Sequence, residues 1–314
     1  MKLLLTYAIC IAMLTQHYNL TAQLVWHSVD SVNVTLPVGL KLYATNDSMY
    51  DGKPNIAYYI EADLNNKNLV FDVDTTLNRR LTPNQYYTKN NKPLVVVNGT
   101  FFSYATNQNL NVVIKKGKVI GHNITKVQRK MPDSSIVNIP INRSAIGITK
   151  RGKADIAWVK TDSNTTFAKA SQAYEIAAEG EPFVPPNVYK KWKVQTAIGG
   201  GPVLLQNGKI AIANGYEQMF TGKAINDKHP RTAMGYTATG KLIILVIQGR
   251  FANIAEGASL AQEAKILQQL GCVEALNLDG GGSSCMLVNG KETITPSEKT
   301  GQRAVPAVFL IKTK

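Results

Sequence analysis

The residues with the clearest chemical potential are Asp279 and the three glycines that follow it. They lie in the segment 275–284, Ala-Leu-Asn-Leu-Asp-Gly-Gly-Gly-Ser-Ser, in which a short apolar run ends on an acid. Glycine loses more backbone freedom on folding than any other residue, so three in a row indicate positive φ angles or a close approach of a ligand. Because Asp-Gly is also a strong hairpin signal, the segment alone fits either a plain turn or a carboxylate that faces a substrate.

A second acid, Glu263, lies on the apolar side of the helix predicted just upstream. Ser259 and Gln262 have the spacing of a capping box at the start of this helix, and Gly271 marks its end. At about 100° per residue, Glu263 falls within the apolar stripe. A carboxyl group placed there must be paired, hydrogen-bonded or protonated. It is either a structural partner of a buried arginine or a functional acid with a raised pKa, and the direct run of the helix into the Asp279 strand favours the second.

Three more segments place polar groups or glycines at predicted strand ends. Asn98-Gly99-Thr100 follows a buried apolar strand, residues 198–202 contain a second glycine triplet, and His229-Pro230-Arg231-Thr232 begins another strand. Each of them alone is most simply a turn. Together they predict strand ends that converge on one concave site, with Arg231 as an anion clamp.

The first 22 residues resemble an export signal. Lys2 precedes a mostly apolar run over residues 3–14, and Leu20-Thr21-Ala22 offers a cleavage site before Gln23. This run is too short to cross a bilayer, and Cys10 lacks the small residues that precede a lipidated cysteine. We therefore expect a secreted or periplasmic protein without a stable membrane anchor.

The charge predicts an anionic partner. The chain carries 35 Lys and Arg against 21 Asp and Glu, a net charge of +14, which favours nucleic acid, a membrane surface or a charged glycan. The basic residues are spread along the chain and form no stripe with aromatic residues, which argues against nucleic acid.

Cysteine and histidine spacing predicts neither a disulfide nor a zinc site. Cys272 and Cys285 are expected to be free and buried, because a hairpin centred on Gly281 would place Cys285 opposite Asn277. The ligand spacings typical of zinc are missing from the sequence. No cofactor is firmly indicated, although Asp279 with nearby carbonyl groups could bind Ca²⁺.

The remaining pattern is mainly that of β-strands. We predict paired strands at 56–64 and 68–73, a buried strand at 94–97, hairpins over 112–120, 203–213 and 232–247, and a last strand at 304–311 that closes the sheet. The polar segment 161–193 is expected to be a partly helical insertion or loop. The predicted class is α+β, with mixed, mostly antiparallel sheets and a few packed helices.

The ordered motifs resemble the phosphodiester glycosidase family. They are NGTFF, GGGP, HPRTAMG, the SLAQEA helix, ALNLDGGGSS and Arg303 in GQRAV. The resemblance covers 94–314 as one domain and leaves 23–93 as a β-rich segment of unknown role, packed on that domain. It implies hydrolysis of a glycosyl bond to a phosphodiester-linked group, on surface or extracellular glycans. Carried over by motif, the site residues are Asn98, Arg231, Glu263, Asp279 and Arg303, with Thr232, Gly281, Gly282 and Ser283 completing the substrate-binding set.

One position departs from the family. An acid often stands before the glycine of an Asp-Gly-Arg-like strand end, where this chain has Gln248 in Gln248-Gly249-Arg250. If that acid takes part in the chemistry, its role is lost or altered here.

The chemistry implied is that of an oxocarbenium-like transition state. Asp279 is assigned as nucleophile, base or cation stabiliser and Glu263 as its partner or as the acid, while Arg231 and Arg303 hold the phosphate. Two alternatives stay open: a non-catalytic module that binds anionic glycans on the same fold, and a phosphodiesterase that cleaves P–O.

Overall fold

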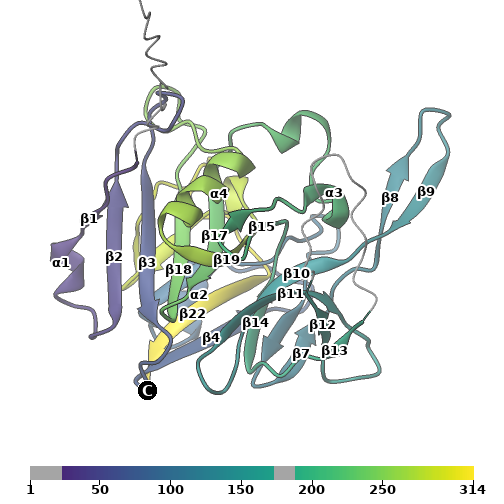
Figure 1. Ribbon diagram of the computed structural model, residues 1–314, viewed down its shortest axis with the longest axis horizontal. Coiled ribbons are helices and arrows are strands. Elements are labelled where there is room, and N and C mark those ends of the chain that lie inside the picture. The colour runs from purple at the N-terminus through teal and green to yellow at the C-terminus, as the bar shows by residue number, and fades with distance from the viewer. Residues whose placement is uncertain (1–22, 173–187) are drawn as a thin grey trace, which may run out of the picture.

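The computed structural model describes residues 23–172 and 188–314, so the predicted signal peptide at 1–22 lies outside the described residues (Figure 1). All strand pairings are antiparallel, in one eight-stranded, one seven-stranded and one five-stranded sheet and a separate hairpin within this part of the chain. The predicted α+β class is confirmed. The helices are short: α1 (Asp30–Asn33), α2 (Pro83–Lys89), α3 (Asn214–Glu217), α4 (Leu260–Gln269) and the 3-10 turns η1 (Gly222–Ile225) and η2 (Gly281–Ser283).

The eight-stranded sheet carries the strand that leads to Asp279. Its order is β1 (His27–Ser28), β2 (Leu40–Thr45), β3 (Ala57–Asp63), β18 (Lys241–Ile247), β17 (Arg231–Thr237), β19 (Cys272–Asn277), β15 (Val203–Gln206) and β16 (Lys209–Ile210). The predicted hairpins over 203–213 and 232–247 are confirmed by the β15–β16 and β17–β18 pairings.

The other two sheets bring further segments of the sequence motifs toward this strand. The five-stranded sheet has the order β21 (Lys291–Glu292), β20 (Met286–Val288), β5 (Val95–Asn98), β22 (Ala307–Thr313) and β4 (Leu69–Thr75). The seven-stranded sheet has the order β13 (Lys190–Lys191), β12 (Lys169–Ser171), β11 (Ala154–Lys160), β10 (Arg143–Ile148), β14 (Thr196–Gly199), β6 (Val113–Lys115) and β7 (Lys118–Gly121). The β6–β7 pairing confirms the hairpin over 112–120.

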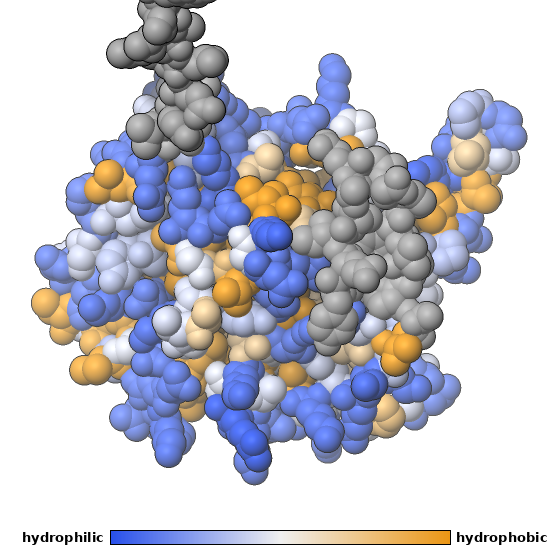
Figure 2. Space-filling model, in the orientation of Figure 1, coloured by the Kyte–Doolittle hydropathy of each residue, from blue (hydrophilic) through white to orange (hydrophobic). Residues whose placement is uncertain are grey.

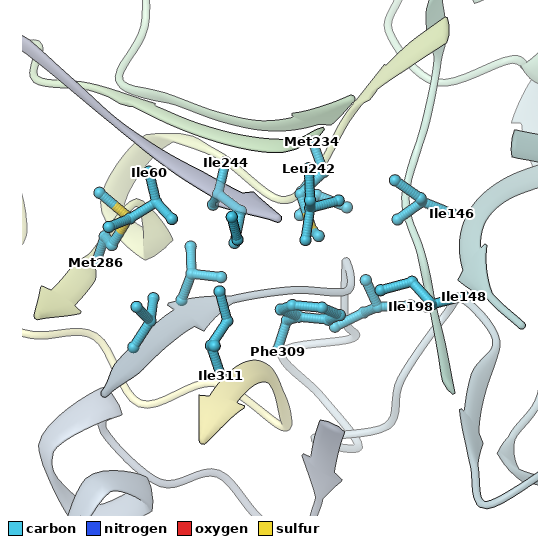
Figure 3. Packing of buried hydrophobic residues seen from close by; sticks show 14 of the residues in the cluster. Ile60, Ile146, Ile148, Ile198, Met234, Leu242, Ile244, Met286, Phe309 and Ile311 are labelled. Atoms are coloured by element: carbon cyan, nitrogen blue, oxygen red, sulfur yellow. The ribbon is translucent and has the colours of Figure 1, made fainter. Parts of the chain in front are cut away.

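One core joins the three sheets (Figure 3). Ile60, Met234 and Ile244 project from the eight-stranded sheet toward Phe309 and Ile311 of the five-stranded sheet, and Ile146, Ile148 and Ile198 close it from the seven-stranded sheet. The opposite face of the eight-stranded sheet is covered by α4, whose apolar stripe packs on β15, β19 and β17. The ends of β19 and β17 are therefore held from both sides, by the core and by α4.

Two predicted pairings are wrong, and both errors concern turns that cross between sheets. The segments 56–64 and 68–73 do not pair: β3 lies between β2 and β18, whereas β4 pairs with β22. The hairpin centred on Gly281 is also wrong, because β19 belongs to the eight-stranded sheet and β20 to the five-stranded sheet. In both places the composition of a polar or glycine-rich turn predicts a hairpin within one sheet, whereas the chain passes to another sheet.

The cysteines are free and buried, as predicted, although for a different reason. Cys272 begins β19, while Cys285 precedes β20 in another sheet.

The predicted segment 23–93 contributes β2, β3 and β4 to two sheets, and its boundary at residue 94 stays a prediction. Within the polar segment 161–193, the described residues form β12 and β13 and no helix, and 173–187 lie outside the described residues.

The separate hairpin of β8 (Lys126–Lys130) and β9 (Ile136–Pro140) projects away from the three sheets (Figure 1). Its apolar residues Met131, Ile136 and Val137 are exposed, and Figure 2 shows apolar atoms among hydrophilic ones along this projection. The segments that carry the motifs lie in the body of the molecule, away from its tip.

The capping box of α4 is confirmed and gives a test of helix stability. The Ser259 hydroxyl accepts from the Gln262 amide at 3.2 Å, and the Gln262 side chain accepts from the Ser259 amide at 3.0 Å. We expect Ser259→Ala to lower the free energy of unfolding by about 1 kcal/mol, measured by urea denaturation. Ser163→Ala, at an exposed loop position, is the control, and equal stability of the two variants would contradict the capping role.

Candidate active site

The turn after β19 is fastened to the ends of two other strands. The Asp279 amide donates to the Gly99 carbonyl at 2.9 Å, just after β5, and the Gly281 amide donates to the Pro230 carbonyl at 2.8 Å, just before β17. The turn is thus held where β5 of one sheet meets β17 and β19 of another.

The glycines of this turn let two guanidinium groups come close. A Cβ atom at Gly282 would lie 2.1 Å from Nη2 of Arg303, and one at Gly281 would lie 2.9 Å from Nη2 of Arg250. Gly281 also has φ +60°, a conformation that favours glycine. Any side chain at residue 282 would displace the Arg303 guanidinium, so clearance for the arginines explains Gly281 and Gly282, whereas a Cβ atom at Gly280 would lie 2.9 Å from the Pro230 carbonyl oxygen.

Asp279 is a partly buried acid with an unsatisfied oxygen. Its Oδ2 is buried and has no hydrogen-bond partner among the described residues. Burial raises the pKa of Asp279 to about 7, against the opposing effects of the Ser283 hydroxyl and the Arg303 guanidinium. Near neutral pH the carboxyl group is therefore divided between its two protonation states.

Arg303 is oriented by a carboxylate and by an aromatic ring. Its Nε and Nη2 donate to Oε2 of Glu298 at 2.8 and 2.5 Å, and its Nη1 lies 3.5 Å from the Ser283 hydroxyl. The guanidinium carbon lies 5.5 Å from the centroid of the Tyr104 ring. One edge of the guanidinium is thus used by Glu298, and Nη1 is left on the side of the Asp279 turn.

Arg250 is a residue of the site that sequence reasoning did not select. It is exposed, has φ +67°, and its Nη2 lies 3.4 Å from Nδ1 of His229. A non-glycine residue at positive φ is uncommon and often marks a functional position. The signal that could have identified it is the segment Gln248-Gly249-Arg250, in which the arginine follows a glycine at a strand end.

Gln248 has a structural partner in this fold. Its side-chain oxygen accepts a hydrogen bond from the Thr295 amide at 2.8 Å, and the side chain is buried. Thr295 begins the loop that carries Glu298 and leads to Arg303. The amide therefore fastens the base of the loop that orients this arginine.

Asn98 and Thr232 hold the main chain behind the acid. The Asn98 amide donates to the Asp279 carbonyl at 2.5 Å, and its oxygen accepts from the Thr232 hydroxyl at 2.9 Å and from the Cys285 amide at 3.1 Å. Both side chains are 0% exposed. The structure thus places them as supports of the turn.

Arg231 and Glu263 are both buried, and Glu263 belongs to α4. Arg231 is 2% exposed, and it donates to the carbonyls of Ala258 at 2.8 Å and Asp227 at 3.1 Å. Glu263 is 0% exposed, and neither carboxyl oxygen has a hydrogen-bond partner among the described residues. Burial raises the pKa of Glu263 to about 8, an effect that the charge of Arg231 opposes. Of the predicted phosphate clamp, Arg303 lies at the Asp279 turn, whereas the Arg231 side chain is buried against the helix.

No group of three or more His, Cys, Asp and Glu side chains is arranged to share a metal ion in residues 23–172 and 188–314. The possible Ca²⁺ at Asp279 therefore has no cluster of carboxylates to support it there. Over the same ranges, no helix has the length and apolar character of a membrane span.

The glycine-rich turn brings the Asp279 carboxyl group, whose pKa is raised, close to the guanidinium groups of Arg303 and Arg250, while a second acid of raised pKa, Glu263, is buried on α4. Acids with perturbed pKa values beside cationic groups are candidates for catalysis. A sequence model described as phosphodiester glycosidase matches residues 91–312. The chain therefore belongs to the phosphodiester glycosidase family, which supports glycosidase-type hydrolase activity.

Individual relatives agree with this assignment. The chain is similar to N-acetylglucosamine-1-phosphodiester alpha-N-acetylglucosaminidase of Mus musculus, with 35% identity over 109 residues, 32% of this chain and 21% of the mouse protein. It is also similar to an uncharacterized protein derived from the SPbeta prophage of Bacillus subtilis, with 39% identity over 74 residues, 24% of this chain and 11% of that protein. The chain spans about a fifth or less of the length of these curated relatives.

Solved structures share the fold. The catalytic domain of the zebrafish N-acetylglucosamine-1-phosphodiester alpha-N-acetylglucosaminidase, auto-inhibited by its pro-peptide, superposes with a TM-score of 0.59 at 22% identity, covering 94% of this chain and 89% of that chain. A hypothetical protein from Synechocystis gives a TM-score of 0.60 at 16% identity, covering 88% of this chain and 62% of that one.

The raised pKa of Glu263 predicts a pH-dependent stability. The folded protein holds this proton up to a pKa of about 8, whereas the ordinary value is 4.5. Stability is therefore lost as the pH rises through this window, because the folded state binds the proton more tightly than the unfolded state. We expect Glu263→Gln, which does not titrate, to gain stability relative to wild type by on the order of a few kcal/mol across this window.

The measurement is urea denaturation of both proteins at a series of pH values. Glu292→Gln, at an exposed glutamate, is the control for the loss of a negative charge. Parallel stability curves for wild type and Glu263→Gln would contradict the raised pKa.

Proposed function

We propose that this protein is an exported hydrolase that cleaves the sugar C1–O bond of a glycosyl-1-phosphodiester on surface or extracellular glycans. The observation that carries this proposal is the approach of the Arg303 and Arg250 guanidinium groups to the glycines that follow Asp279. The arrangement offers an acid for the sugar and cations for the phosphate within one turn. Family membership and the activity for which the mouse relative is named support the same reaction.

Asp279 is suited to act on the anomeric carbon. Its pKa of about 7 leaves a large anionic fraction at neutral pH, and its Oδ2 has no hydrogen-bond partner in residues 23–172 and 188–314. Cleavage of C1–O develops positive charge on the sugar ring, which an adjacent carboxylate stabilises or attacks. Asp279 is accordingly proposed as nucleophile or cation stabiliser.

The arginines are suited to the leaving group. A phosphodiester already leaves readily as an anion, and guanidinium groups bind phosphate oxygens through parallel N–H donors. Arg303 presents Nη1 beside Ser283, and Arg250 lies over Gly281. We propose that these two residues hold the phosphate, a role that the sequence had assigned to Arg303 and Arg231.

We propose a joint role for Glu263 and Arg231, which are both buried. At neutral pH the raised pKa keeps Glu263 largely protonated, so the charge of Arg231 is not neutralised by it. The Arg231 main chain lies beside Gly280, while its guanidinium is held by the carbonyls of Ala258 and Asp227. Its charge adds to the positive field around the site, which favours an anionic substrate. The neutral carboxyl group is also a possible proton donor, although a phosphodiester leaving group needs little acid assistance.

Substitution of Asp279 tests the proposal. On synthetic glycosyl-1-phosphodiesters, Asp279→Asn is expected to lower kcat by at least about 100-fold, because the isosteric amide cannot supply the negative charge. Asp133→Asn, at an exposed hairpin acid, is the matched control and should retain wild-type turnover. The readout is release of free sugar, with circular dichroism to verify folding.

Two results would contradict the proposal. Wild-type turnover in Asp279→Asn would remove this residue from the chemistry. Measurable binding of anionic glycans without release of sugar from any glycosyl-1-phosphodiester would favour the non-catalytic module.

A further inference from the structure

A second positive group, Arg80, lies next to the same exposed tyrosine that Arg303 contacts. Tyr104 is 61% exposed, and its ring centroid lies 5.5 Å from the guanidinium carbon of Arg303 and 5.3 Å from that of Arg80. Phe102 supports this ring at 4.8 Å between centroids and lies 5.2 Å from the Arg80 guanidinium carbon. Arg80 is thus held by two aromatic rings.

Arg80 has aromatic contacts but no acidic partner. It lies between β4 and α2, is half-buried, and makes no hydrogen bond or ion pair with any residue in the described ranges. Aromatic contacts use the face of a guanidinium and leave its in-plane N–H donors available. By contrast, Glu298 already occupies one edge of Arg303. Arg80 is therefore a fixed cation whose N–H groups are available to donate hydrogen bonds to an anion.

The position of Arg80 extends the proposed phosphate site in one direction. Asp279, Ser283, Arg303, Tyr104 and Arg80 follow one another through the contacts given above. The two ring contacts of Tyr104 place the guanidinium carbons of Arg303 and Arg80 no more than about 11 Å apart. Two phosphates joined by a single small linker unit, such as a short polyol, fit within this upper limit.

We propose that Arg80, with Tyr104, forms a second anion subsite that binds the next phosphate of the leaving group. The inference rests on the proposed function and narrows its substrate class to glycosyl-1-phosphodiesters whose aglycone carries a further phosphate, as a chain of repeated phosphodiesters does. The phosphate bonded to the sugar C1 oxygen lies at Arg303 and Arg250, and the neighbouring phosphate of the leaving group lies at Arg80. The net charge of +14 agrees with a polyanionic substrate.

Kinetics on a matched pair of substrates tests the subsite. Both carry the same sugar 1-phosphodiester on a propanediol aglycone, which ends in a hydroxyl in one and in a phosphate in the other. Wild type is expected to show a kcat/KM about tenfold higher for the phosphate-ended substrate, mostly through a lower KM. Arg80→Gln should lose this preference and keep wild-type kinetics on the hydroxyl-ended substrate.

Two variants separate the subsite from general charge and from structure. Arg79→Gln removes the same charge at the neighbouring exposed residue and should keep the preference. Arg80→Lys keeps the positive charge but lacks the planar set of guanidinium donors, so it should keep part of the preference for the phosphate-ended substrate. A loss of activity on both substrates in Arg80→Gln would assign this residue a structural role and overturn the subsite.

Binding without turnover separates failure of the subsite from failure of the proposed function. Calorimetry compares 1,3-propanediol bisphosphate with 1,3-propanediol monophosphate on the intact protein. Tighter binding of the bisphosphate that disappears in Arg80→Gln supports the subsite even if no substrate is cleaved, a result that would contradict only the hydrolase. Equal affinity for the two ligands in wild type, or an unchanged preference in Arg80→Gln, would overturn the subsite.

Discussion

The close approach of Arg303 to the main chain at Gly282 is the contact on which the rest of the site depends. A guanidinium group can lie over this turn only because residue 282 has no side chain. The same group opposes the rise in the pKa of Asp279 that burial produces. A single steric condition, the missing Cβ, thus sets the position of an anion-binding group that also lowers the pKa of the acid beside it.

The sheets supply the frame for this contact. Asp279 follows β19, Asn98 ends β5 and Thr232 lies at the start of β17, so three strand ends from two sheets meet at one point. Asn98 donates a partly buried hydrogen bond to the Asp279 carbonyl and accepts a buried one from the Thr232 hydroxyl. The loop with Glu298 then orients Arg303 from the outside, while its base is fastened by Gln248. The glutamine at this family position therefore has a fold-related task, and the acids of the site lie elsewhere.

Local features of the site could be predicted from the sequence because local patterns determine them. The capping box at Ser259, the burial of Glu263 on the apolar side of α4 and the position of Asp279 at a strand end all follow from spacing over a few residues. Sheet membership could not be predicted in the same way. The turns at 65–67 and 280–284 have hairpin composition, but each carries the chain to another sheet, and turn residues alone do not determine which strand lies opposite. Because the contacts of Arg250 and the burial of Arg231 also depend on which strands lie opposite, only the tertiary structure shows that Arg250 is exposed at the site and that Arg231 is buried.

The most direct test of the account is the position of the bond that is cleaved. Hydrolysis of a synthetic glycosyl-1-phosphodiester in ¹⁸O-labelled water, followed by mass spectrometry of both products, identifies it. The account predicts that the label enters the C1 hydroxyl of the released sugar, because water or Asp279 attacks the anomeric carbon while the arginines retain the phosphate. Label in the phosphate product would show cleavage of P–O and would contradict the account.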